Sequence, residues 1–129
     1  MPFRSNTSKH LAELFGVLSN PNRIRLVEEL NRRGEMDVGS LEVELGISHS
    51  AVSQHLSLLR AHRIVNERRD GRHVHYRLSQ DGLAVWILQG LAFVEREFQN
   101  EPLRQDLEQA RAYWAAPAKL AKTKVSRQS

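Results

Sequence analysis

The change of hydrophobic period within residues 38–78 constrains the fold more than any other feature of the sequence. Residues 38–45 and 48–62 carry apolar side chains at helical spacing, and the break between them is Gly46-Ile47-Ser48. Glycine suits the end of a helix and serine suits the cap of the next one. Residues 73–78 alternate apolar and polar side chains instead, as strands do. A short helix, a tight turn, a longer helix and then strands predict a winged helix-turn-helix.

Asp70-Gly71 marks the expected tip of a β-hairpin, which we call the wing. The pair lies between two extended runs, and Asp-Gly is among the dipeptides that accept positive φ at both central positions of a type I′ turn. We therefore expect two antiparallel strands joined at residues 70 and 71.

Helices are expected on both sides of this unit. Ser8 can cap the first helix, and Asn20 followed by Pro21 suits the start of the second. The predicted fold class is mainly α with a small β-hairpin (α+β). The flanking helices are expected over residues 8–18, 20–33, 81–99 and 100–114.

Positive charge is concentrated in the part of the chain that carries this pattern. The chain has a net charge of +4, and residues 47–78 alone hold six basic and two acidic residues. Residues 1–46 hold six basic and seven acidic residues, and residues 79–116 hold three and six. Positive charge confined to one module suggests a polyanionic partner, although a solvated basic surface would have the same composition.

The longer helix of the pair has an unusual polar side. Val52, Leu56 and Leu59 form an apolar stripe, so the opposite side should face solvent. No acidic residue occurs from position 46 to position 65. Small hydroxyl side chains let a helix enter the major groove, glutamine can pair with adenine and arginine with guanine, whereas an acid would face phosphates. The alternative is an ordinary surface helix that is polar and lacks acids by chance. We predict that this side binds DNA through His49, Ser50, Ser53, Gln54, Ser57 and Arg60.

Basic residues also surround the expected tip of the wing. They can reach the phosphate backbone or the adjacent minor groove, although charge on an edge strand also prevents aggregation. A protein-interaction module is the alternative, and it would show exposed apolar or aromatic residues on the reading helix. Double-stranded promoter DNA is the predicted partner, contacted at the wing by Arg68, Arg69, Arg72 and His73.

The segments LSNPNRIRLVEEL and VGSLEVELGISHSAVSQHLSLLRAHRIVNERRDGRHVHYRLS resemble the ArsR/SmtB family of bacterial winged-helix repressors. The resemblance runs from about residue 11 to residue 98. It implies a homodimer that binds an imperfect inverted repeat in a promoter and is released by an inducer, whose identity the residues do not give.

The resemblance also implies that the first and fifth helices form the dimer interface. Residues 83–98 are independently apolar on more than one side, and such a helix buries one side in its own core and another against a partner. Gly90 would allow close approach of that partner. The predicted dimerisation residues are Leu11, Leu14, Phe15, Leu83, Trp86, Ile87, Gly90, Leu91 and Val94.

The metal ligands of this family are replaced here. The corresponding positions hold Asp37, Gly39, Gln80, Gly82, Phe93 and Arg96. The chain has no cysteine and six histidines, of which His73 and His75 have a spacing that is compatible with a metal. We predict no metal site and no cofactor, and a histidine-based metal sensor of the same fold is the alternative.

Sequence motifs of enzymes are missing as well, so we predict no catalytic activity. The first residues lack the apolar stretch of a secretory signal, and the composition agrees with a bacterial cytoplasmic protein. The expected organisation is a flexible N-terminus over residues 1–7, a winged-helix DNA-binding and dimerisation domain over 8–99, a C-terminal helix over 100–116 and a basic disordered tail over 117–129.

Overall fold

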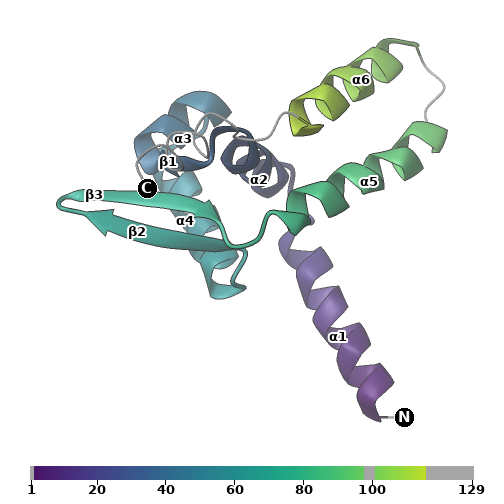
Figure 1. The fold of residues 1–129 in the computed structure, drawn as a ribbon, viewed down its shortest axis with the longest axis horizontal. Helices are drawn as coiled ribbons and strands as arrows, with labels where there is room; N and C mark the ends of the chain where they lie inside the picture. The colour runs from purple at the N-terminus through teal and green to yellow at the C-terminus, as the bar shows by residue number, and fades with distance from the viewer. Residues whose placement is uncertain (1, 98–100, 116–129) are drawn as a thin grey trace, which may run out of the picture.

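The computed structural model describes residues 2–97 and 101–115, so the predicted tail lies outside the described residues. The fold is mainly α with a small sheet, as expected (Figure 1). None of the helices in these two ranges is long and apolar enough to cross a membrane. The elements are α1 (Pro2–Val17), α2 (Pro21–Arg33), β1 (Glu35–Asp37), α3 (Val38–Leu45), α4 (His49–Ala61), β2 (Val65–Asp70), β3 (His73–Leu78), α5 (Gly82–Glu97) and α6 (Glu101–Ala115).

One core lies under α2, α3 and α4. Asn20 starts α2 as predicted, because its side chain accepts hydrogen bonds from the backbone N–H groups of Asn22 and Arg23. The apolar sides of the three helices meet the first residues of β2 and α5. The residues at the centre of this core are Leu26, Val27, Leu30, Leu41, Leu56, Leu59, Val52 and Val65.

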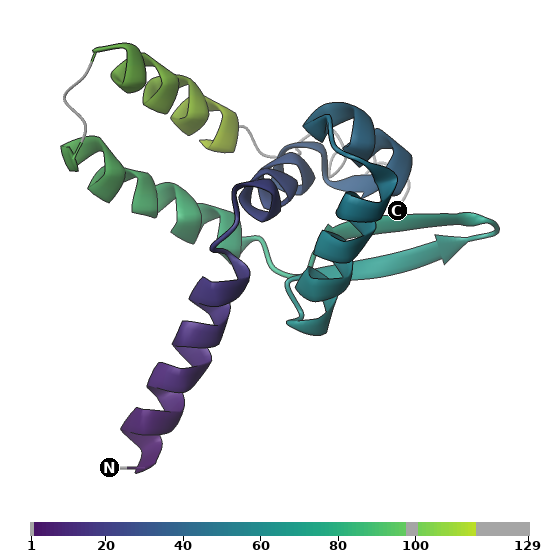
Figure 2. The same cartoon turned by 180° about the vertical axis from the view of Figure 1, so that it is seen from behind.

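The turn between α3 and α4 is built as the sequence predicts. Gly46 has a left-handed backbone with φ of 66°, and its N–H donates to the carbonyl of Glu42 over 2.8 Å. Ser48 caps α4 by accepting a hydrogen bond from the N–H of Ala51 over 3.1 Å. The two helices are thereby held in a helix-turn-helix arrangement (Figure 2).

The sheet has three strands, whereas the sequence predicted two. The order is β1-β3-β2, with both neighbouring pairs antiparallel. Residues 35–37 pair with residues 75–77 of β3. A strand of three residues is too short to show alternation, so only pairing with a distant strand identifies it.

The hairpin turn is shifted by one residue from the predicted position. Asp70 pairs with His73 as the last residue of β2, so the two turn residues are Gly71 and Arg72. Gly71 has φ of 63°, and among the described non-glycine residues only Arg63 has a positive φ. Positive φ at the first turn position alone is the pattern of a type II′ turn, so the predicted type I′ turn is wrong.

The first helix begins earlier than expected. Helix α1 starts at Pro2, so Ser8 is an interior residue rather than the N-cap, and residues 2–7 are helical. Figures 1 and 2 both show α1 extending away from the body of the protein. Helix α5 begins one residue after its predicted start and α6 ends one residue after its predicted end, whereas the predicted boundary between them, at residues 99 and 100, lies outside the described residues.

Helix α6 packs against α2 through its last turns. Leu107 and Trp114 are buried, and Asn31 donates a hydrogen bond to the carbonyl of Trp114 over 3.1 Å. The hydroxyl of Tyr113 donates to Glu29, and burial together with this carboxylate raises the pKa of Tyr113 to about 12. The predicted C-terminal helix is thus attached to the domain that contains the helix-turn-helix.

Candidate nucleic-acid interface

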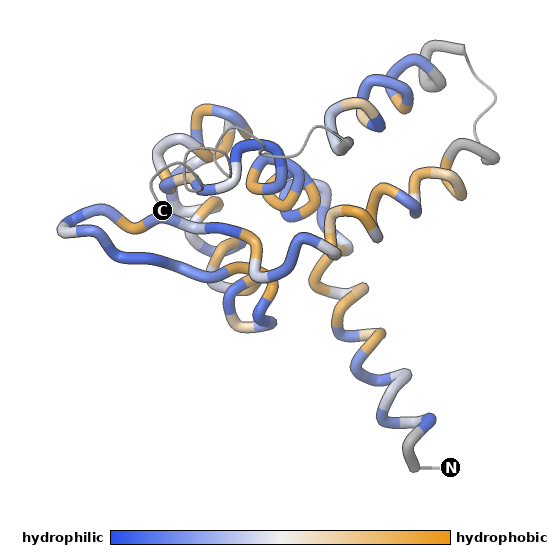
Figure 3. Tube along the Cα trace, viewed as in Figure 1, coloured by the Kyte–Doolittle hydropathy of each residue, from blue (hydrophilic) through white to orange (hydrophobic). Residues whose placement is uncertain are grey.

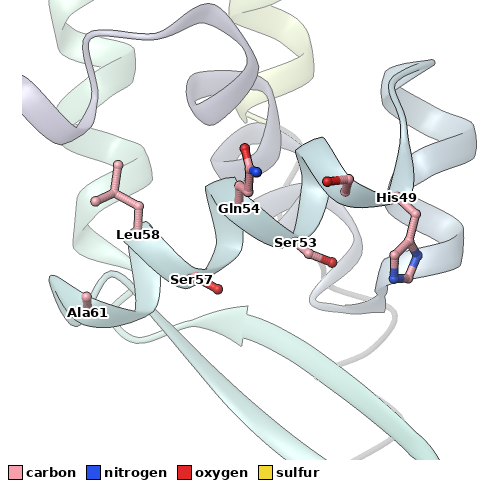
Figure 4. A pocket seen from close by; sticks show the side chains of 7 residues that line it. His49, Ser53, Gln54, Ser57, Leu58 and Ala61 are labelled. Atoms are coloured by element: carbon pink, nitrogen blue, oxygen red, sulfur yellow. The ribbon is translucent and has the colours of Figure 1, made fainter.

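The outer side of α4 forms a shallow hollow on the protein surface. The buried residues Val52, Leu56 and Leu59 fix the rotation of α4, because they pack into the core and turn the opposite side outward. Figure 4 shows the side chains of this outward side projecting from a single helix. The hollow is lined by His49, Ser50, Ser53, Gln54, Ser57, Leu58 and Ala61.

Five of the six residues predicted on this helix line the hollow, and Arg60 is the one that does not. The structure adds Leu58 and Ala61, which sequence analysis missed. Leu58 follows Gln54 by four positions and is 37% exposed, so helical spacing alone could have found it. Apolar side chains on such a face can contact the methyl group of thymine.

Three of the predicted DNA contacts, one histidine and two arginines, lie against acids from neighbouring elements. The pairs are His49 Nδ1 with Glu42 Oε2 at 3.1 Å, Arg60 Nη1 with Glu67 Oε1 at 2.7 Å, and Arg68 Nη2 with Glu35 Oε1 at 2.5 Å. Helix α3, strand β2 and strand β1 supply these acids. The acid-free stretch of sequence therefore does not form an acid-free surface, because Glu42 and Glu67, which flank it in the sequence, contact His49 and Arg60 within it.

The pair between Arg68 and Glu35 joins the outer strands of the sheet. Arg68 donates two hydrogen bonds, from Nε over 3.2 Å and from Nη2 over 2.5 Å, to the two carboxylate oxygens. These bonds hold the pKa of Glu35 below its ordinary value. Since β3 lies between β1 and β2, the pair spans the sheet across its middle strand.

The predicted DNA contacts of the wing are divided between its two faces. Cross-strand partners share a face, so Arg68 opposite His75 and Asp70 opposite His73 lie on one face, and Arg69 opposite Val74 lies on the other. Arg72 stands in the turn itself. Arg69 and Arg72 are exposed, and neither forms an ion pair with another described residue.

Helix α4 is held against α2 by Arg23. Its Nε donates to the carbonyl of Val17 over 2.5 Å, and Nη1 lies 3.4 Å from Nδ1 of His55. Burial and the neighbouring guanidinium lower the pKa of His55. His55 therefore contacts the neighbouring helix and does not line the hollow on the outward side of α4.

Asp37 has a structural role at the start of α3. Its carboxylate accepts a hydrogen bond from the N–H of Ser40 over 2.8 Å, and this bond is the main reason why the pKa of Asp37 is lowered.

The two histidines of the wing lie close together. The rings of His73 and His75 lie 6.4 Å apart on the face of the wing that also carries Arg68. Within the described residues, no three histidine, aspartate or glutamate side chains are arranged to hold a metal ion.

A second exposed surface lies on α1 and α5. Figure 3 shows apolar residues along both helices, and the rings of Phe15 and Trp86 stack with centroids 5.6 Å apart. Among the nine predicted dimerisation residues, the exposed ones are Leu11, Phe15, Trp86, Gly90 and Val94, whereas Leu14, Leu83, Ile87 and Leu91 pack against the protein's own core. Sequence analysis did not assign Val85 and Phe93, which are 57% and 71% exposed, to this surface.

Known proteins match the region that contains these elements. The family of bacterial regulatory proteins described as the arsR family matches residues 20–67, from the cap of α2 into β2. The chain is 37% identical over 82 residues to the nodulation protein NolR of Rhizobium meliloti and 40% identical over 74 residues to the SmtB homolog of Synechocystis, a transcriptional repressor. These matches cover 64% and 57% of the chain. They span 66% and 55% of the two relatives, less than two thirds of either.

One solved structure is similar to this chain over a larger share of its own length than the two relatives above. The crystal structure of NolR from Sinorhizobium fredii superposes with a TM-score of 0.60 at 35% identity. The superposition covers 73% of this chain and 92% of that one. The matched family is one of regulatory proteins rather than enzymes. The chain belongs to the arsR family of bacterial regulatory proteins.

Proposed function

We propose that this protein is a sequence-specific DNA-binding transcriptional repressor that binds an inverted-repeat operator as a homodimer. The observation that carries the proposal is the outward side of α4, which presents serine, glutamine and small apolar side chains over an open hollow. A helix of this kind fits the major groove of B-DNA, which is about 12 Å wide, because small side chains let its backbone approach the bases.

Within this face, Gln54 is the residue with the greatest capacity to read sequence. Its amide can donate and accept at once, which matches the N6 and N7 atoms of adenine. Ser50, Ser53 and Ser57 can donate to base edges or phosphates without steric conflict. Leu58 and Ala61 offer contacts to thymine methyl groups at the other end of the face.

The apolar surface on α1 and α5 supports a homodimer. Large apolar side chains exposed together on two helices are unfavourable in water and mark an interface. A twofold-symmetric pair would present two α4 helices, so the operator half-sites should be centred about one helical turn, 34–36 Å, apart or a multiple of that distance.

We propose that this repressor does not respond to metals. The family positions for ligands hold Asp37, which caps α3, and Phe93, which cannot bind a metal. Zinc, cadmium, nickel and arsenite should change operator affinity by less than about threefold, roughly 0.6 kcal/mol. A tenfold loss of affinity with micromolar zinc that disappears in a His73→Ala/His75→Ala variant would instead favour the histidine-based sensor.

The test is selection of genomic DNA fragments by the purified protein, followed by fluorescence anisotropy over a salt titration with the selected duplex. We expect an inverted repeat and an affinity at least a thousandfold higher than for an unrelated duplex. Equal affinity for both duplexes at every salt concentration would contradict the proposal.

The homodimer is tested by replacing an exposed residue, so that loss of folding does not confuse the result. Phe15→Glu places a charge in the proposed interface and should give a monomer by sedimentation, with helical circular dichroism retained. Val43→Glu is the matched control, because Val43 is 81% exposed on α3 and lies outside the proposed interface. A wild-type monomer at micromolar concentration would contradict the homodimer.

A further inference from the structure

The ion pair between Arg60 and Glu67 lies where the recognition helix meets the wing. Arg60 follows Ser53 by seven positions and Ser57 by three, so these three residues form one row along α4. Glu67 lies in β2, six residues after the end of α4. The 2.7 Å contact from Nη1 to Oε1 therefore bridges the two elements that the proposed function brings to DNA.

The two partners of this ion pair differ in solvent exposure. The side chain of Glu67 is 25% exposed, and that of Arg60 is 54% exposed. Glu67 is opposite Tyr76 in the register of β2 and β3 and also takes part in a hydrogen bond with it. Burial and Glu67 together raise the pKa of Tyr76. The carboxylate is thus held from the wing side, and the guanidinium is the more exposed member of the pair.

We propose that Glu67 is a specificity-determining residue that withholds the Arg60 guanidinium from phosphates in non-specific complexes. The inference rests on the proposed function. Glu67 and a phosphate compete for the same N–H donors, and an exposed pair is weak enough to exchange. The exchange requires DNA held close to the junction of α4 and β2, which a duplex reaches when α4 is seated in the major groove. Arg60 then adds a contact in the operator complex and none elsewhere.

The test compares Glu67→Gln with wild type on the selected operator and on an unrelated duplex. Releasing Arg60 should raise affinity for the unrelated duplex three- to tenfold and steepen its log–log salt dependence by about 0.9, the value for one added phosphate contact. Operator affinity should change less than twofold, so the ratio of specific to non-specific affinity should fall.

A double-mutant cycle separates this effect from the loss of one negative charge. In an Arg60→Ala background, Glu67→Gln should no longer raise non-specific affinity. Asp70→Asn is the control, because Asp70 is an exposed acid of the wing whose nearest ion-pair partner is Arg68 at 4.0 Å. Its effect on non-specific affinity should be the same in the wild-type background and in the Arg60→Ala background.

Two results would overturn the inference. One is a Glu67→Gln variant whose affinity and salt dependence on the unrelated duplex equal those of wild type. The other is a gain that persists undiminished in the Arg60→Ala background. Both presuppose a wild-type protein that prefers its operator, so they differ from the failure of the proposed function, in which wild type shows no preference at all.

Discussion

The outward side of α4 and the wing are the two surfaces proposed to bind DNA, and they differ in charge. Between its ends, the side of α4 carries serine, glutamine and small apolar side chains with no formal charge. The wing carries arginines and histidines, and one of these arginines, Arg68, is bound to Glu35 by two hydrogen bonds. One surface thus has polar groups without charge, and the other has charge that is partly neutralised.

This difference separates recognition of bases, which we assign to α4, from binding of the phosphate backbone, which we assign to the wing. Base edges are recognised by hydrogen bonds and methyl contacts of fixed geometry, which neutral side chains supply, whereas phosphates are recognised by charge. The net charge of the sequence overstates the positive charge that is available to DNA, because Arg60 at the end of α4 and Arg68 in the wing already have carboxylate partners. Among the described residues of the wing, Arg69, Arg72 and Arg77 are exposed arginines for which no carboxylate partner is seen.

The largest expected effect comes from giving the neutral side of α4 a negative charge. Ser57→Glu should lower operator affinity more than a hundredfold, about 3 kcal/mol or more, because the carboxylate would face phosphates at close range. Fluorescence anisotropy with the selected operator measures the loss. Ser5→Glu on α1 is the matched control, an exposed serine that becomes the same acid away from α4, and it should bind as wild type does.

A smaller loss is expected when a reading group is removed without adding charge. Gln54→Ala should cost about 1–3 kcal/mol on the operator and relax base preference at one position, while leaving the salt dependence unchanged. Competition among operators with single substitutions measures the preference. An unchanged ranking of these operators would show that Gln54 does not read a base.

The wing should respond in the opposite manner. Arg69→Ala or Arg72→Ala should weaken binding to operator and unrelated duplex alike, by about 1 kcal/mol each, and should reduce the salt slope by about one. Salt-titrated anisotropy on both duplexes measures this. An effect confined to the operator would assign these arginines to base reading and remove the distinction between the two regions.

Local signals in the sequence predicted the helix-turn-helix, and tertiary pairing produced what the sequence did not predict. Gly46 and Ser48 form their capping hydrogen bonds with residues at most four positions away in the sequence, so their roles follow from local backbone chemistry. Strand β1 pairs residues 35–37 with residues 75–77, and the ion pair joins Glu35 to Arg68, so both contacts are between distant parts of the chain that no pattern of spacing reports.

The candidate site shows the same division. The outward residues of α4 followed from helical periodicity, and only Leu58 and Ala61 were missed, because polar side chains alone were considered. The predicted turn was wrong by one residue, since cross-strand pairing of Asp70 with His73 placed the turn at Gly71 and Arg72.

The smallest expected effect concerns Arg63, which connects the two regions. Arg63 has a left-handed backbone with φ of 60° in a Schellman motif at the end of α4, in which its N–H donates to Arg60 and that of Ile64 donates to Leu59, both over 2.9 Å. A side chain in this conformation is strained, and glycine is not. Arg63→Gly should therefore be about 1 kcal/mol more stable than Arg63→Ala, as measured by urea unfolding.

The alanine variant is the control for charge, because both substitutions remove the same cation and only one removes Cβ. If Arg63 contributes to DNA binding by charge alone, the two variants should lose the same affinity for any duplex, although their stabilities differ. If the connection between α4 and the wing must instead be rigid, the glycine variant should lose more operator affinity than the alanine variant despite its greater stability. That result would mean that the two regions act as one surface whose spacing is fixed by a strained residue.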